Sequence, residues 1–255
     1  MNNKLQTVVC MKWGTRYNYN YVNNLYDSIK KHTNKKTQII CFTDNSENIN
    51  KNVICKPLPK IKIPKQLSFT PWRKLSIWKY PLSELYGDIL FLDLDLVVTS
   101  NLDKFFEYKP GKYCVIENWT QLGKNIGNTS CFRFPVKKYK FIFDDFEKNP
   151  DYIWKKFHIE QVYISKKIKE QNFWPKKWCQ SFKHNLLPKW PIRLWKPADL
   201  TDETSIVAFT GKPDPEDVIN EKWPVPKKKF YKKIYKQVKC PNWLKDNWKI
   251  NLDNL

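Results

Sequence analysis

The sequence contains little glycine, and this scarcity limits the kinds of structure and site that it can form. Only 6 of the 255 residues are glycine, against 17 proline. Such a composition argues against a flexible low-complexity chain and favours ordered structure with rigid turns. The sequence also has no glycine-rich loop of the kind that cradles phosphate, and it has no internal repeat.

Cysteine spacings typical of metal or redox sites are also missing, as are long apolar runs. The seven cysteines are scattered, and no two form a C-x-x-C pair, which argues against a zinc knuckle or a redox dithiol. The N-terminus does not resemble a signal peptide, and no apolar run approaches the ~18 residues of a transmembrane helix. We therefore expect free, mostly buried thiols in a cytoplasmic protein.

Acidic residues are outnumbered by basic ones. Lysine and arginine total 46 against 25 aspartate and glutamate residues, which gives a formal net charge of +21. A field of this sign attracts nucleic acid, anionic lipid headgroups or acidic saccharides, although genomic nucleotide bias also enriches lysine. The charge is not accompanied by zinc-ligand spacing or an RNP-like strand, so no nucleic-acid partner is expected.

Short apolar runs alternate with helical patterns along most of the chain. The expected strands cover residues 7–11, 38–42, 89–92, 113–116, 130–134 and 206–209. The expected helices cover residues 21–32, 71–80, 137–147 and 159–170. This alternation predicts a layered α/β domain, which we place at residues 1–222.

The main chemical signal is FLDLDLVV at residues 91–98. Side chains at positions i and i+2 of an extended chain share a face, so Asp93 and Asp95 are expected to converge on one ligand. Two carboxylates at the C-terminal end of a central strand suit Mn²⁺ or Mg²⁺, which bridge carboxylates to phosphates. The alternative is a strand end that carries two solvated acidic residues.

Several segments, taken in order, resemble the GT-A glycosyltransferases. The resemblance is greatest to glycosyltransferase family 8, which includes glycogenin and lipopolysaccharide galactosyltransferases, and to its small uncharacterised bacterial or viral relatives. The segments are VVCMKWGTRY, ICFTDN, WRKL, FLDLDLVV, GNTSCFRF, HIEQVYIS, WCQSFKHNLLP and VAFTGKPDP. The resemblance implies the GT-A fold of class α/β, with a mixed, mainly parallel central sheet flanked by helices.

The same resemblance assigns roles to individual residues. It implies a nucleotide-sugar donor, with UDP as the expected carrier, and transfer with retention of configuration to a saccharide or lipid-linked acceptor. Asp93 and Asp95 would bind the metal. Gln161 would lie beside the anomeric carbon, with Glu160 as the alternative, and Lys212 would balance charge on the leaving diphosphate. The other residues expected to bind the donor are Asp44, Arg73, Lys74, Asn128 and Ser130.

One position departs from the family pattern. Relatives carry His-Gly-Lys-Pro after the last strand, and that histidine is a metal ligand, but residues 210–213 here read TGKP. The hydroxyl of Thr210 is a weaker ligand than imidazole for a divalent ion. The pattern therefore leaves open a catalytically weak relative that only binds its ligand, with His184 as a candidate replacement ligand.

The aspartate motif also fits another enzyme class. DLDLV satisfies the signature of haloacid-dehalogenase-like phosphatases, in which the first aspartate is a nucleophile and the second an acid/base. That family places the motif near the start of its catalytic domain, whereas a βα-patterned region precedes it here. The glycosyltransferase interpretation therefore remains the main prediction.

Residues 223–255 read as a basic, aromatic C-terminal tail. Apolar side chains recur at helical spacing among the lysines of residues 227–239: Phe230, Tyr231, Ile234, Tyr235 and Val238. This pattern predicts a helix on an anionic membrane surface, with Trp243 and Trp248 at the level of the headgroups. Such a helix would hold the enzyme at the inner membrane face near a glycolipid acceptor. The alternative is a helix that packs on the domain.

Overall fold

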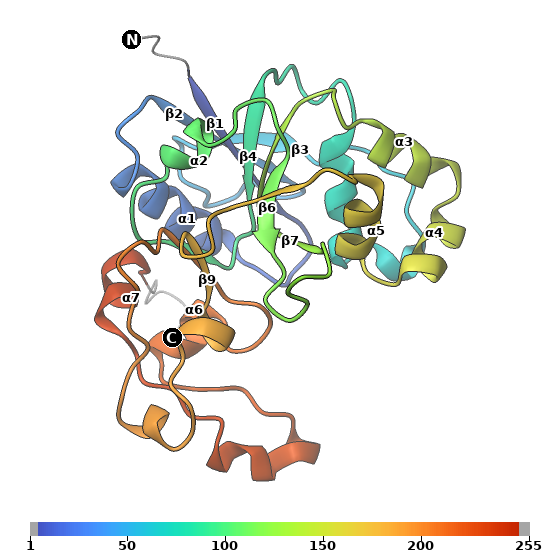
Figure 1. Ribbon diagram of the computed structural model, residues 1–255. Coiled ribbons are helices and arrows are strands. Elements are labelled where there is room, and N and C mark those ends of the chain that lie inside the picture. The colour runs from blue at the N-terminus through green and yellow to red at the C-terminus, as the bar shows by residue number, and fades with distance from the viewer. Residues whose placement is uncertain (1–4, 250–255) are drawn as a thin grey trace.

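The chain folds around a mixed sheet of seven strands, and the computed structural model describes residues 5–249 (Figure 1). The strands are β1 (Gln6–Lys12), β2 (Thr37–Thr43), β3 (Ile54–Pro57), β4 (Asp88–Leu92), β6 (Cys114–Glu117), β7 (Gly127–Pro135) and β8 (Asn172–Phe173). Their order is β3-β2-β1-β4-β7-β6-β8, with β7 antiparallel to both of its neighbours and the other pairs parallel. The predicted mixed, mainly parallel sheet is confirmed.

A smaller sheet adjoins the larger one. It contains β5 (Leu96–Val98), β9 (Cys179–Ser181) and β10 (Ile206–Ala208), in the order β5-β10-β9. Because β5 begins shortly after β4 ends, residues 93–95 form the turn through which the chain passes from one sheet to the other. The two aspartates thus lie in a turn between two strands, whereas the sequence pattern predicted a simple strand end.

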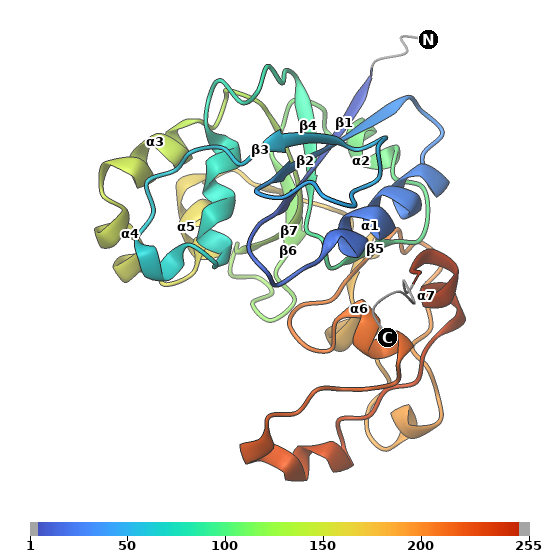
Figure 2. The same ribbon diagram turned by 180° about the vertical axis from the view of Figure 1, so that it is seen from behind.

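Helices cover both faces of the larger sheet (Figure 2). One face is covered by α1 (Tyr19–Lys31), α2 (Lys104–Glu107) and α7 (Asn242–Asn247), and the other by the 3-10 helix η2 (Pro71–Trp78), α3 (Phe141–Lys148), α4 (Pro150–Phe157) and α5 (Glu160–Lys167). The remaining helical segments are η1 (Lys65–Leu67), η3 (Phe182–Leu186), η4 (Ile192–Leu194), α6 (Pro215–Ile219) and η5 (Lys227–Ile234).

Alternating side chains of the central strands feed the two resulting cores. Val8 and Cys10 of β1 pack in the cluster beneath α1, whereas Val9 and Met11 belong to the cluster beneath η2 and α5. Every residue of β1 is buried, as expected for a strand covered on both faces. This burial fixes the register of the sheet and hence the positions of the loops at its C-terminal edge.

The C-terminal segment differs from the predicted helix. η5 has non-helical backbone angles at Lys229 and ends at Ile234, and Val238 is buried in the main core instead of continuing an exposed stripe. Lysines three and four residues apart disfavour a helix by only a few tenths of a kcal/mol per pair, whereas Val238 gains burial in the core by leaving the helical stripe. The prediction of one continuous helix over residues 227–239 is therefore wrong.

The two tryptophans beyond this segment pack on the domain. Trp248 is buried and contacts Tyr21 of α1 edge to face, with 5.0 Å between ring centroids. The indole N–H of Trp243 donates to the carbonyl of Ala198 at 2.8 Å. The buried ring of Trp248 is not available at a membrane surface, so the prediction is wrong for Trp248. Trp243 is half-buried with its N–H engaged, and its place at the headgroups stays a prediction.

Only the middle of the C-terminal segment extends away from the sheets. Figures 1 and 2 show η5, drawn in orange-red, at the bottom of the molecule, whereas α7 returns to lie beside α1. Among residues 5–249 no helix is long and apolar enough to cross a bilayer. The division of the chain at residue 222 stays a prediction. The helix α7, which lies beyond that division, contributes to the core of the preceding region.

We predict that Trp248→Ala lowers the free energy of unfolding by about 3–5 kcal/mol, because the substitution empties a large buried volume. Urea denaturation followed by circular dichroism measures this change. The matched control is Trp195→Ala, which removes an indole that is 64% exposed and should change stability by less than about 0.5 kcal/mol. An equally small effect of the two substitutions would show that the packing of Trp248 on α1 does not stabilise the domain.

Candidate functional site

A pocket of about 480 Å³ lies where the two sheets meet. Its walls come from the loop after β1, the start of η2, the 93–95 turn, β7, the start of α5 and the segment after β10. Of the residues predicted for the donor site, those that line this pocket are Lys74, Asp93, Asp95, Asn128, Ser130, Glu160 and Gln161. Residues far apart in the sequence are thus brought together.

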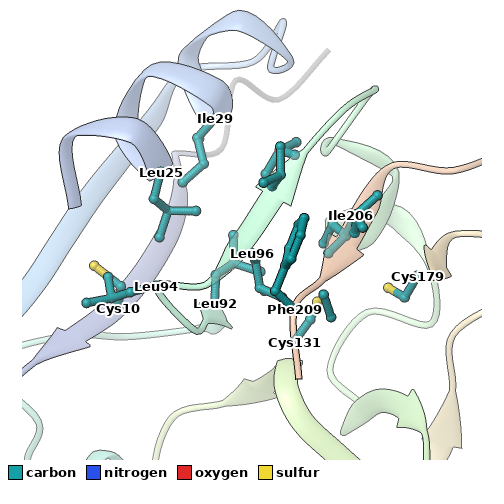
Figure 3. Packing of buried hydrophobic residues seen from close by; sticks show 14 of the residues in the cluster. Cys10, Leu25, Ile29, Leu92, Leu94, Leu96, Cys131, Cys179, Ile206 and Phe209 are labelled. Atoms are coloured by element: carbon teal, nitrogen blue, oxygen red, sulfur yellow. The ribbon is translucent and has the colours of Figure 1, made fainter. Parts of the chain in front are cut away.

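The turn between the sheets is held on both sides, and this directs its aspartates into the pocket. The backbone N–H of Asp93 donates to the carbonyl of Ser130 at 2.8 Å, and the N–H of Phe209 donates to the carbonyl of Asp95 at 3.2 Å. Leu94, between them, is buried in the core. Figure 3 shows it with Leu92, Cys10 and Leu25 in the apolar cluster.

A buried ammonium group neutralises one end of this acidic turn. Nζ of Lys74 lies 3.0 Å and 3.2 Å from the two carboxylate oxygens of Asp93, and 3.9 Å from Oε1 of Glu160. It also donates to the carbonyl of Thr129 at 3.2 Å. Burial alone would lower the pKa of Lys74, but Asp93 and Glu160 outweigh this effect and raise its pKa. The lysine therefore stays charged.

The second aspartate has a different environment. The hydroxyl of Tyr17 donates to Oδ2 of Asp95 at 2.9 Å. Burial, followed by repulsion from Asp93, raises the pKa of Asp95 to about 7, although the hydrogen bond from Tyr17 acts in the opposite direction. This carboxyl therefore holds its proton more tightly than an ordinary aspartate does, and a nearby positive charge would favour its ionised form.

The oxygen atoms of the pocket fit a hard divalent cation. Asp93 and Asp95 present carboxylates, and the hydroxyl of Thr210 is buried without a hydrogen-bond partner in the described part of the chain. A buried hydroxyl without a partner is costly, so a water molecule or cation there would stabilise it. Within residues 5–249 no group of three or more His, Cys, Asp or Glu side chains could hold a metal. Oxygens of the ligand and of water would have to complete the coordination shell.

Four other candidates from the sequence lie outside the residues that line the pocket. Asp44 is exposed and accepts the backbone N–H of Gly14 at 2.8 Å. Lys212 forms ion pairs with Asp214 and Asp217 at 2.7 Å and 2.9 Å. Arg73 and His184 complete this group of candidates, and a role for any of the four remains a prediction.

The structure adds residues that were not singled out individually from the sequence. Arg16 and Tyr17 line the pocket from VVCMKWGTRY, one of the segments that carry the resemblance to the family. Phe69, 77% exposed, lies across Gly14, where φ is +62° and an added Cβ would come within 2.7 Å of the ring. Thr129 donates to Glu160 at 3.1 Å. Arg16 and Tyr17 had a sequence signal, because they lie in a segment that resembles the family. Phe69 and Thr129 had none. The alternation of side chains along β7 cannot reveal that Thr129 contacts Lys74.

The arrangement of elements matches solved glycosyltransferases. No protein-family model matches the chain, and no curated protein matches it in sequence. GlyE from Streptococcus pneumoniae TIGR4 matches with a TM-score of 0.54 and 18% identity, over 82% of this chain and 56% of GlyE. An active-site Gln-to-Glu mutant of LgtC matches with a TM-score of 0.54 and 11% identity, over 82% of this chain and 89% of LgtC. This chain has a GT-A glycosyltransferase fold.

The GT-A prediction is therefore confirmed at the level of the fold. The bifunctional glycosyltransferase WbbM also matches, with a TM-score of 0.54 and 13% identity, over 82% of this chain and 46% of WbbM. The chain thus spans little more than half the length of GlyE and less than half that of WbbM. Identities this low support a shared fold, whereas activity must be argued from the pocket.

We predict that Asp95→Asn changes how the stability of the cation-free protein depends on pH. Because the folded state binds the Asp95 proton more tightly than the unfolded chain does, this proton stabilises the fold fully below about pH 4. The contribution is lost as the pH rises through about 7. The variant should match the wild type at pH 4 and exceed it by about 1–2 kcal/mol at pH 8, since an open pocket screens part of the effect.

Urea denaturation at a series of pH values, with chelator present, measures this difference. Asp151→Asn removes a surface carboxylate that does not line the pocket, and it should follow the wild-type curve. A constant difference between Asp95→Asn and the wild type across this range would contradict the assignment.

Proposed function

We propose that this chain is a metal-dependent glycosyltransferase that moves a sugar from a nucleoside diphosphate donor, with UDP as the expected carrier. The main support for this function is that Asp93, Asp95 and Gln161 line one pocket of a glycosyltransferase fold. Asp93 and Asp95 would hold a divalent cation, which would supply positive charge against the negative charge of the departing diphosphate.

Residues of the chain would prepare this site in two ways. Lys74 holds Asp93 in place through both carboxylate oxygens, and Tyr17 holds Asp95, so the acidic turn would need little reorganisation to receive a cation. Preformed electrostatic groups of this kind favour the transition state because they do not have to be reoriented during the reaction. Asn128 and Ser130 border the same space and would contact the sugar.

Gln161 is our candidate for the residue beside the anomeric carbon. Its Oε1 accepts from Nδ2 of Asn118 at 3.3 Å, so the amide side chain is positioned where α5 begins. Glu160 is buried and engaged by Thr129 and Lys74, which makes it a poorer candidate for direct contact with the sugar. A retaining reaction would then depend on positioning and on assistance from the diphosphate.

We predict that UDP binds only together with Mn²⁺ or Mg²⁺, and that Asp95→Asn weakens this binding at least about tenfold by removing one carboxylate ligand. Isothermal titration calorimetry at pH 8, with and without chelator, measures both effects. Asp93→Asn should act in the same direction, and Asp151→Asn is the matched control. Equal UDP affinity in excess chelator would contradict metal dependence.

The projecting part of the C-terminal segment would bring the enzyme to its acceptor. Phe230, Tyr231 and Ile234 of η5 are 72%, 53% and 68% exposed, and lysines surround them. The ring of Trp223 lies 6.0 Å from the guanidinium of Arg193 and 5.3 Å from Nζ of Lys236, which connects this segment to the η4 region. Exposed aromatic residues among lysines suit an anionic membrane surface, where a glycolipid acceptor would be reached.

We predict that replacing Phe230, Tyr231 and Ile234 together by serine reduces sedimentation with anionic vesicles at least about tenfold, because their apolar side chains would no longer enter the interface. Sedimentation at low salt with vesicles rich in phosphatidylserine measures binding. Point substitutions are needed because a chain ending at Glu221 would also lack the packed α7.

The double variant Tyr86→Ser and Leu122→Ser is a suitable control, since these side chains are 75% and 60% exposed elsewhere on the surface. It should sediment like the wild type. If the η5 variant also sediments like the wild type, the segment does not bind membranes, and a soluble saccharide becomes the expected acceptor.

A further inference from the structure

The positive charges that border the pocket differ in how fully they are already engaged. In the described chain, the basic side chains among the lining residues are those of Arg16 and Lys74. Lys74 is buried, and its ammonium group is occupied by Asp93, Thr129 and the nearby Glu160. Little of its bonding capacity remains for a ligand, so Lys74 is better suited to holding the acidic turn than to binding phosphate.

Arg16 is open to solvent at the edge of the same pocket. Its side chain is 61% exposed, and a guanidinium nitrogen lies 4.0 Å from Oδ1 of Asp214, which is longer than a hydrogen bond. The guanidinium carbon lies 5.0 Å from the centre of the Tyr17 ring, and the Tyr17 hydroxyl binds Asp95. Arg16 is therefore near the acidic turn while much of its side chain remains accessible to a ligand.

Lys212, which was expected to balance the charge of the diphosphate, is arranged differently. Asp214 and Asp217 hold its ammonium group, and these two residues also form the capping box of α6. Moving Lys212 to a ligand would break both ion pairs, whereas Arg16 would give up a long contact with Asp214 and its contact with the Tyr17 ring. Of these two cations, Arg16 therefore requires less rearrangement.

We propose that Arg16 binds the diphosphate of the donor, taking the role that the family pattern assigned to Lys212. This inference rests on the proposed function, and it identifies the residue that distinguishes a diphosphate from an uncharged nucleoside. A guanidinium presents several N–H donors in one plane and can bind two phosphate oxygens at once. Lysine carries the same charge but lacks this fork, so it is an imperfect substitute.

Calorimetry with UDP and with uridine, in the presence of Mn²⁺, tests the assignment. Arg16→Ala should weaken UDP binding by about 10- to 100-fold, the range for loss of a hydrogen bond between charged groups, and should leave uridine binding unchanged. Arg16→Lys should be intermediate. Lys36→Ala removes a positive charge that precedes β2, away from the pocket, and should bind UDP like the wild type.

Three results would overturn the assignment: wild-type UDP affinity in Arg16→Ala, equal weakening of UDP and uridine, or a larger loss in Lys212→Ala than in Arg16→Ala. Arg16→Gln, which keeps much of the side-chain length, provides the same test if the alanine variant does not fold. The proposed function fails separately, and the assignment with it, if the wild-type protein binds none of a panel of nucleoside diphosphates with Mn²⁺.

Discussion

The ammonium group of Lys74 connects four elements around the pocket. It extends from η2 to Asp93 in the turn between the sheets, to Thr129 on β7 and towards Glu160 at the start of α5. A buried charge is tolerated only where opposite charges and hydrogen bonds compensate for lost hydration. These elements must therefore stay in register, since displacement of any one would leave a buried charge without its partner.

The turn at residues 93–95 uses this fixed frame. Its two carboxylates face the pocket because Leu94 is buried and because β7 and Phe209, the residue after β10, hydrogen-bond to the turn on either side. Burial, and after it the proximity of Asp93, raises the pKa of Asp95, and a bound cation would favour the ionised carboxylate. The burial and the neighbouring charge that disfavour ionisation of Asp95 are therefore the features that a positive charge at the turn would offset.

The sequence was informative where a single element carries the signal. Continuous apolar runs located β1, β2 and β4, and the two aspartates after β4 were correctly expected to lie close together. It was less informative where a residue's role depends on partners from other segments. The pairing of Lys212 with Asp214 and Asp217, and the open position of Arg16, depend on how the loops after β1 and β10 are folded.

The C-terminal segment illustrates the same limit. Helical spacing within residues 227–239 correctly marked exposed aromatic side chains, but it could not show that Val238 and Trp248 gain burial by packing on the domain. That burial divides the segment into a projecting part and a packed part. Local periodicity describes the surface that a helix would have, whereas tertiary packing decides whether the helix forms.

The pocket is proposed to transfer a sugar from a nucleoside diphosphate sugar to an acceptor. The most direct measurement is release of nucleoside diphosphate from a panel of nucleotide sugars, with Mn²⁺ and simple saccharide acceptors. Our account predicts that the wild-type protein releases diphosphate from at least one donor, and that chelator stops the release. Absence of release from every donor, together with liberation of inorganic phosphate from phosphomonoesters, would contradict it and favour a phosphatase.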